Sequence, residues 1–322
     1  MTKLATEIAA TIPSRMKKKY FNDFRQHKAY YFMLTPMIVF FVLFAYLPMP
    51  GLYLAFVDYD FVKKIASPFV GFKNFEFLFY GGMDSIIWKL TFNTIVYNIA
   101  FIVLGVVTQM GLAVILKEIT SRLFVKVSQT VMLAPHFVSM VIVGVIVYNL
   151  FNYKYGVVNN TLTALGFGKY DFYQNPQAWP IIIVLVQIWK SVGYGAIVYM
   201  AAILGIDESI YEAAYIDGAS NLKRIRHITL PLLKPTAILL VLLALGGVLK
   251  GQFDLFYQII GNNGLLLNAT DIIDTYVYRS LAVDFNMGRG SAAGLYQSVF
   301  GFILIVAVNK IVNKFSPENA LF

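Results

Sequence analysis

The feature that most constrains this chain is a series of six apolar stretches, each long enough to cross a lipid bilayer as an α-helix. A membrane-spanning helix needs about 20 consecutive, mostly apolar residues. Hydrophobic residues make up 58% of the chain and charged residues 13%, so one soluble core could not bury the apolar surface. We therefore predict an all-α, polytopic membrane protein with six transmembrane helices. They cover residues 30–56, 90–116, 127–151, 178–206, 235–260 and 290–309.

The positions of lysine and arginine predict the orientation of these spans. With six spans, both termini lie on the same side as the connections 117–126 and 207–234, and that side holds 16 of the 26 lysines and arginines. Basic residues favour the cytoplasmic side of a membrane. We therefore predict a basic cytoplasmic segment at 1–28, a six-helix domain at 29–322, and cytoplasmic N- and C-termini. The net charge of +9 then reflects topology, and we expect no nucleic-acid partner.

The sequence lacks the residues that several kinds of chemistry require. It has no cysteine, which excludes disulfides and thiolate metal sites. Its three histidines are scattered at positions 27, 136 and 227, so we expect no metal site. The phosphate-binding pattern Gly-x-x-x-x-Gly-Lys-Ser/Thr is absent, and the chain cannot hydrolyse ATP by that chemistry. We therefore expect a protein that is not itself an enzyme.

The connection between the fourth and fifth stretches predicts a short helix with a small side-chain surface. Asp207 or Ser209 can cap a helix that begins near Ile210. Glu212, expected in its first turn, suits the helix dipole, and two alanines follow it. Gly218 allows the chain to leave the helix. Such a helix could fit tightly into a groove of another protein.

The residues of this connection resemble the signature loop of binding-protein-dependent ABC importer permeases. The pattern is Glu-Ala-Ala, three residues, Gly, nine residues and Ile-x-Leu-Pro. Segments 70–75, 134–139 and 286–293 likewise resemble segments of sugar permeases, and 313–316 is similar to the subgroup that handles complex oligosaccharides and polysaccharide fragments. The predicted contacts with an ATPase subunit are Glu212, Ala213, Ala214, Asp217, Gly218, Ile228, Leu230 and Pro231.

This resemblance implies a type I ABC importer permease in the inner membrane of a bacterium. It implies a second, homologous permease subunit, two ABC ATPase subunits that bind ATP and Mg²⁺, and an extracellular substrate-binding protein. The expected substrate is a carbohydrate, an oligosaccharide or polysaccharide fragment. A peptide or an amino acid is the alternative cargo within the same family.

Polar and aromatic residues recur at helical spacing in the fourth and fifth stretches. Ionisable groups inside a membrane are costly and usually face a cavity or a partner. We predict that these residues line the substrate path, with contact between the two permeases as a second possibility for Lys190. The alternative is that they pack helices or reach the headgroups. The candidates are Gln187, Lys190 and Tyr194, followed by Gly247, Lys250, Asp254 and Tyr257.

Two rival functions are kept open. A self-sufficient secondary transporter usually shows internal repeats, and no clear repeat is present here. A membrane-embedded enzyme such as a glycosyltransferase would need paired acidic residues at an interface. Asp271 and Asp274 are the nearest candidates for such a pair.

Overall fold

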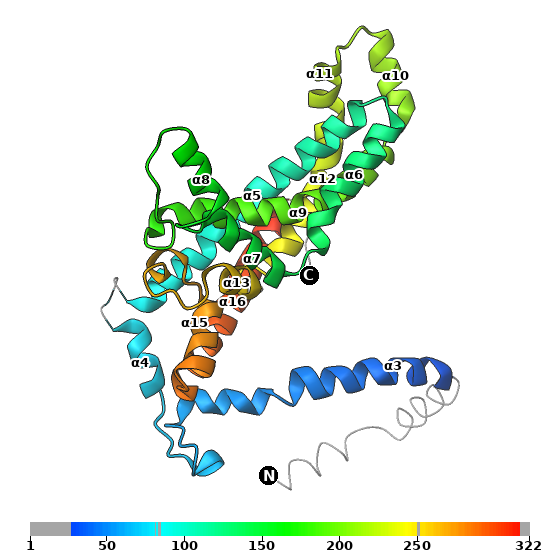
Figure 1. Ribbon diagram of the computed structural model, residues 1–322. Helices are drawn as coiled ribbons and strands as arrows, with labels where there is room; N and C mark the ends of the chain where they lie inside the picture. The colour runs from blue at the N-terminus through cyan, green and yellow to red at the C-terminus, as the bar shows by residue number, and fades with distance from the viewer. Residues whose placement is uncertain (1–26, 81, 83–84, 250–251, 316–322) are drawn as a thin grey trace. The chain divides into compact units, whose positions relative to one another are not determined.

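The computed structural model describes residues 27–80, 82, 85–249 and 252–315, and the regular elements in these ranges are helices (Figure 1). Within these ranges, an isolated antiparallel bridge joins Val57 and Phe69. The prediction of an all-α chain is confirmed. Contacts divide the chain into two units, Met1–Tyr53 and Leu54–Phe322.

The described part of the first unit is one apolar helical stretch. Helix α3 covers Lys28–Phe41, a π-helical turn covers Val42–Tyr46, and a 3-10 helix covers Met49–Phe56 and crosses the unit boundary. The stretch Lys28–Phe56 is long and apolar enough to span a membrane. No side chain of α3 is buried by the described residues of its own unit.

Helix α5, Ile86–Glu118, organises the second unit. Its buried residues recur every three or four positions, at Ile87, Leu90, Thr94, Tyr97 and Phe101. This spacing places them on one face of the helix. The face is buried in apolar clusters with α9, Trp179–Leu204, with α13, Phe253–Ile260, and with α16, Met287–Phe315.

The third apolar stretch is broken. Helix α6 covers Arg122–Phe137 and α7 covers Met140–Phe151, with a bend of 97° between them. Pro135 lies in the last turn of α6, and the Ser139 hydroxyl accepts the Ile142 N–H at 3.4 Å to begin a new helix. The described residues contain five helices that could span a membrane, and this bent pair would be a sixth.

The predicted bounds of the fifth span, 235–260, are wrong at both ends. The helix begins with α11, Asn221–Arg224, continues through a π-helical turn at Ile225–Thr229, and ends with α12, Leu230–Leu245. Gly246 and Gly247 follow, and two adjacent glycines disfavour a helix. The chain then forms α13 as a separate helix.

The shorter helices lie in the connections. They are α4 (Lys73–Phe79), α8 (Val157–Ala164), α10 (Glu208–Ile216), α14 (Leu267–Thr270) and α15 (Ile273–Tyr278), with a π-helical turn at Arg279–Val283. Figure 1 shows α10 and α11 together at one end of the second unit, away from α4 and α15.

Candidate functional site

Helix α10 begins and ends with local hydrogen bonds. Of the two caps that the sequence allowed, Asp207 and Ser209, the structure has Asp207, whose carboxylate accepts the Ser209 N–H at 2.9 Å. Hydrogen bonds from Ser209 lower the pKa of Asp207. The helix begins at Glu208, so Glu208 rather than Glu212 lies in the first turn. Gly218 has a φ of +74°, and its N–H donates to the Tyr215 carbonyl at 3.0 Å. This geometry ends the helix in a Schellman motif.

The side chains of α10 are available to a partner. Every residue of this helix is at least partly exposed, and the exposed fraction reaches 71% at Tyr215 and 83% at Ile216. Glu212 and Ala213 are exposed, and Ala214 is half-buried. The structure therefore brings the first part of the signature together on one short, exposed helix.

The second part of the signature lies on the next helix. Ile228 is in the π-helical turn, and Leu230 and Pro231 begin α12. A proline inside a helix loses one hydrogen bond and clashes with the carbonyl four residues earlier. Just before Pro231, the Leu230 N–H donates to the Ile225 carbonyl, five residues back, where an α-helix would use the carbonyl four residues back. The π-helical turn thus allows the helix to continue through Pro231 into α12.

Contacts from side chains join this loop to the end of α5. The Tyr211 hydroxyl and the Thr229 hydroxyl are 3.0 Å apart, and Lys117 Nζ lies 5.6 Å from the centre of the Tyr211 ring. The Asn221 amide donates to the Glu118 carboxylate at 3.0 Å. The loop is therefore held on the helices that carry it, while the surface of α10 is left open.

Two of the predicted path residues line one cavity. Gln187 of α9 and Gly247, after α12, border a cavity of about 330 Å³ whose other wall is α5. Gln187 Oε1 is buried and has no hydrogen-bond partner among the described residues. The other polar side chains in the lining belong to Asn98, Gln109, Ser191 and Gln252. A cavity lined by amides and a hydroxyl inside an apolar bundle suits water or a hydroxyl-bearing solute.

Lys190 and Tyr194 face a different place, the break between α6 and α7. Lys190 Nζ donates to the carbonyls of Val138 at 2.5 Å and His136 at 3.1 Å. The Tyr194 ring stacks on the His136 ring, with 4.8 Å between the ring centres and 13° between the planes. Lys190 thus has partners within this chain.

The predicted row of path residues on the fifth span is corrected by the structure. The helix ends at Leu245, so Gly247, Asp254 and Tyr257 do not share one helical face. Asp254 is exposed in the first turn of α13, where Tyr257 stacks on Phe253. Lys250 lies outside the described residues.

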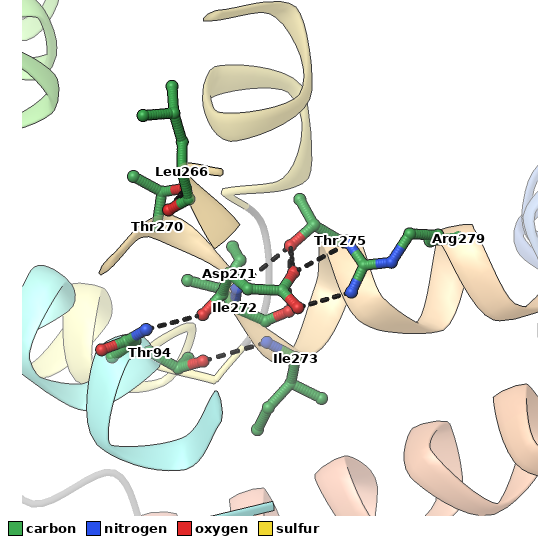
Figure 2. A network of polar contacts seen from close by, with 9 residues as sticks. Thr94, Leu266, Thr270, Asp271, Ile272, Ile273, Thr275 and Arg279 are labelled. Atoms are coloured by element: carbon green, nitrogen blue, oxygen red, sulfur yellow. Dashed lines mark hydrogen bonds and ion pairs between the residues drawn. The ribbon is translucent and has the colours of Figure 1, made fainter. Parts of the chain in front are cut away.

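An ion pair that the sequence did not predict fixes the segment between α14 and α16. Figure 2 shows the Asp271 carboxylate facing the Arg279 guanidinium, with oxygen–nitrogen distances of 2.5 and 3.2 Å, and the Thr275 hydroxyl donating to Asp271 at 2.8 Å. From α5, the Asn93 amide donates to the Asp271 carbonyl at 3.0 Å, and the Thr94 hydroxyl accepts the Ile273 N–H at 3.1 Å.

Asp271 and Asp274, the two carboxylates considered for a membrane-embedded enzyme, both make contacts that hold the fold together. Asp271 is buried and paired with Arg279, and Asp274 accepts the Gln297 amide at 2.9 Å. The spacing of Asp271, Thr275 and Arg279, four residues apart each time, was the one local signal of this network. The described residues also hold no cluster of three side chains that could bind a metal ion.

The chain is similar to known membrane transport proteins over most of its length. Residues 101–316 match the family model described as binding-protein-dependent transport system inner membrane component. A polygalacturonan/rhamnogalacturonan transport system permease protein of Bacillus subtilis is 33% identical, across 96% of this chain and 95% of that protein. A chain of a bacterial ABC transporter involved in the import of the acidic polysaccharide alginate has a TM-score of 0.82 at 30% identity, covering 92% of this chain and 99% of that one. A second structure shows an alginate transporter in complex with an alginate pentasaccharide-bound periplasmic protein, and its matching chain has a TM-score of 0.81 at 30% identity, covering 92% of this chain and 98% of that one.

Proposed function

Because this chain belongs to the family of binding-protein-dependent transport system inner membrane components, we propose that it is a permease subunit of an ATP-driven importer for carbohydrates. The observation that carries this proposal is similarity over nearly the whole chain to the polygalacturonan/rhamnogalacturonan permease protein. The fold shared with a chain of the alginate importer supports it. The cargo that fits both is an oligosaccharide or polysaccharide fragment.

The proposed partners follow from the two ends of the molecule. Helix α10 would insert into a cleft of an ATPase subunit. That subunit, and not this chain, would bind ATP and Mg²⁺. Its exposed surface and its rigid caps support this role. A second, homologous permease would complete the pathway, and an extracellular binding protein would deliver the sugar. The termini would be cytoplasmic, on the same side as α10.

The proposed substrate path includes the cavity bordered by Gln187 and Gly247. The amide oxygen of Gln187, which none of the described residues pairs with, can accept a hydrogen bond from a sugar hydroxyl or from water. Tyr194, Asp254 and Tyr257 lie outside this cavity, and they are candidates for other parts of the path. Lys250 is a candidate from the sequence alone.

Reconstituted transport tests this function. The chain would be placed in vesicles with its partner permease, ATPase subunits and binding protein, and uptake of labelled oligogalacturonides would be compared with uptake of a neutral maltooligosaccharide and a peptide. We expect sugar uptake that requires both ATP and the binding protein. Sugar uptake by this chain alone would favour a secondary transporter, and peptide uptake in place of sugar would overturn the proposed cargo.

A further inference from the structure

The break between α6 and α7 leaves backbone carbonyls exposed in the middle of an apolar stretch. The last carbonyls of any helix lack partners within that helix. In the apolar part of a membrane, each unpaired carbonyl costs several kcal/mol. The bend of 97° after Phe137 therefore requires donors from elsewhere.

Lys190 supplies these donors from α9. Its Nζ donates to the carbonyls of Val138 and His136 at 2.5 and 3.1 Å, and at 3.4 Å to the carbonyl of Pro135, which also accepts the Val138 N–H at 3.2 Å. A lysine has three N–H groups, and all three are used here. A positive charge also suits the C-terminal end of a helix dipole. Because its N–H groups are donated to the backbone, Lys190 has none left for a sugar hydroxyl.

Two neighbours of Lys190 contact α6 in the two turns before the same break. Gly193 packs so closely on α6 that a Cβ at this position would overlap the Met132 carbonyl. Tyr194 stacks on His136, one residue from the end of α6. Residues three and four positions apart share one face of a helix. One face of α9 therefore contacts α6 from Met132 to the bend.

The same helix leads directly to α10. Residues 205–207 separate the end of α9 from the start of α10, and Lys190 lies about 21 Å from Leu204 along the helix at about 1.5 Å per residue. On the other side of the bend, α7 packs against α13, where Val143 and Val147 share an apolar cluster with Phe256. Helix α9 is thus joined both to the loop that carries α10 and to the bent pair.

We propose that Lys190 is a positioning residue of the transport cycle, which fixes the angle between α6 and α7 and makes α7 follow the movements of α9. When a partner displaces α10, α9 moves with it, and the hydrogen bonds of Lys190 carry that movement to the bend. The role in transport rests on the proposed function, but the hold on the bend does not depend on the cargo.

A distance measurement in the assembled complex tests this role. The chain contains no cysteine, so spin labels can be placed at Val131 on α6 and Val145 on α7, which are both exposed. In Lys190→Met, we expect the distance distribution to broaden or shift, and uptake to fall on the order of tenfold while ATP hydrolysis continues. Lys190→Arg keeps several donors and should retain both the distribution and uptake. Lys89→Met, which removes an exposed lysine of α5, is the matched control.

An unchanged distance distribution in Lys190→Met would overturn the proposal, whatever happens to uptake. If Lys190→Met does not accumulate, Gly193→Ala provides a second measurement. Its added methyl group should push α6 away from α9 and change the same distance, and an unchanged distance there would also count against the proposal. Failure of the proposed function is a separate result, because it would appear as absent sugar uptake by the unmodified complex while the distance changes remained.

Discussion

Two connecting segments of the second unit are both built from short helices, yet they are held in opposite ways. Helix α10 has no buried residue, and hydrogen bonds at its ends give it its shape. Most residues of the segment 266–283 are buried or half-buried, and the segment is joined to α5 by side-chain hydrogen bonds and stabilised by the ion pair of Asp271 and Arg279. The first leaves its residues open to the proposed ATPase partner, whereas the second uses its residues to hold the chain together. Substitutions in the first should therefore change transport, and those in the second should change stability.

Positions 70 and 122, in the first and second connections between the predicted spans, should differ completely in access from outside the cell. A single cysteine at position 70, before α4, should react with an impermeant reagent added to intact cells, because we predict that the connection between the first two spans is external. A cysteine at position 122, at the start of α6, should react only after the membrane is opened. Labelling of both positions in intact cells would contradict the six-span topology.

Glu212→Lys should stop uptake while leaving the fold intact. Glu212 is exposed on α10, so the substitution changes the proposed ATPase-binding surface without disturbing a core. Glu208→Lys makes the same charge change at the start of the same helix, and it should retain more uptake. Uptake and co-purification of the ATPase would be measured together. Normal values of both in Glu212→Lys would remove this residue from the coupling surface.

Asp271→Asn should instead lower the free energy of unfolding, by about 3 kcal/mol, because it leaves the Arg279 guanidinium without its charged partner. Unfolding in detergent would be followed by circular dichroism. Asp254→Asn removes an exposed carboxylate from α13 and is the matched control. Equal stability of the two variants would mean that the ion pair does not hold the segment 266–283.

Gly218→Val should have a smaller effect, because it strains a single turn. The φ of +74° costs a residue with a Cβ about 1 to 2 kcal/mol. The strain should displace the end of α10 and reduce uptake, with little effect on insertion. Gly218→Asn is the control, because asparagine tolerates this conformation better than valine does. Equal uptake by the two variants would show that the backbone at this turn does not matter for coupling.

The contrast between the two segments also explains what could be predicted from the sequence. The cap by Asp207 and the turn at Gly218 depend on neighbours within a few residues, and a local pattern can reveal them. The contact of Asn93 with Asp271 joins residues 178 positions apart, and no local pattern identifies such a partner. The break in the third span was missed because apolar content measures only whether a segment can enter a membrane. Pro135 and Ser139 end one helix and begin another without changing that content.

The smallest expected effect is a dependence of α10 on pH. Hydrogen bonds from Ser209 lower the pKa of Asp207 in the folded chain, below the ordinary value of about 3.9. The charged cap therefore contributes stability above that value, and this contribution is lost as the pH falls through the lower pKa of the folded state. The chemical shift of the Ser209 amide in detergent-solubilised protein should titrate with a midpoint below about 3.9. Asp207→Asn keeps an oxygen that can accept the same hydrogen bond but does not titrate, so the midpoint should disappear. A midpoint at or above the ordinary value would mean that the cap does not favour the charged form, and the contacts of Tyr211 and Asn221 would then matter more than the charge of Asp207 for the position of α10.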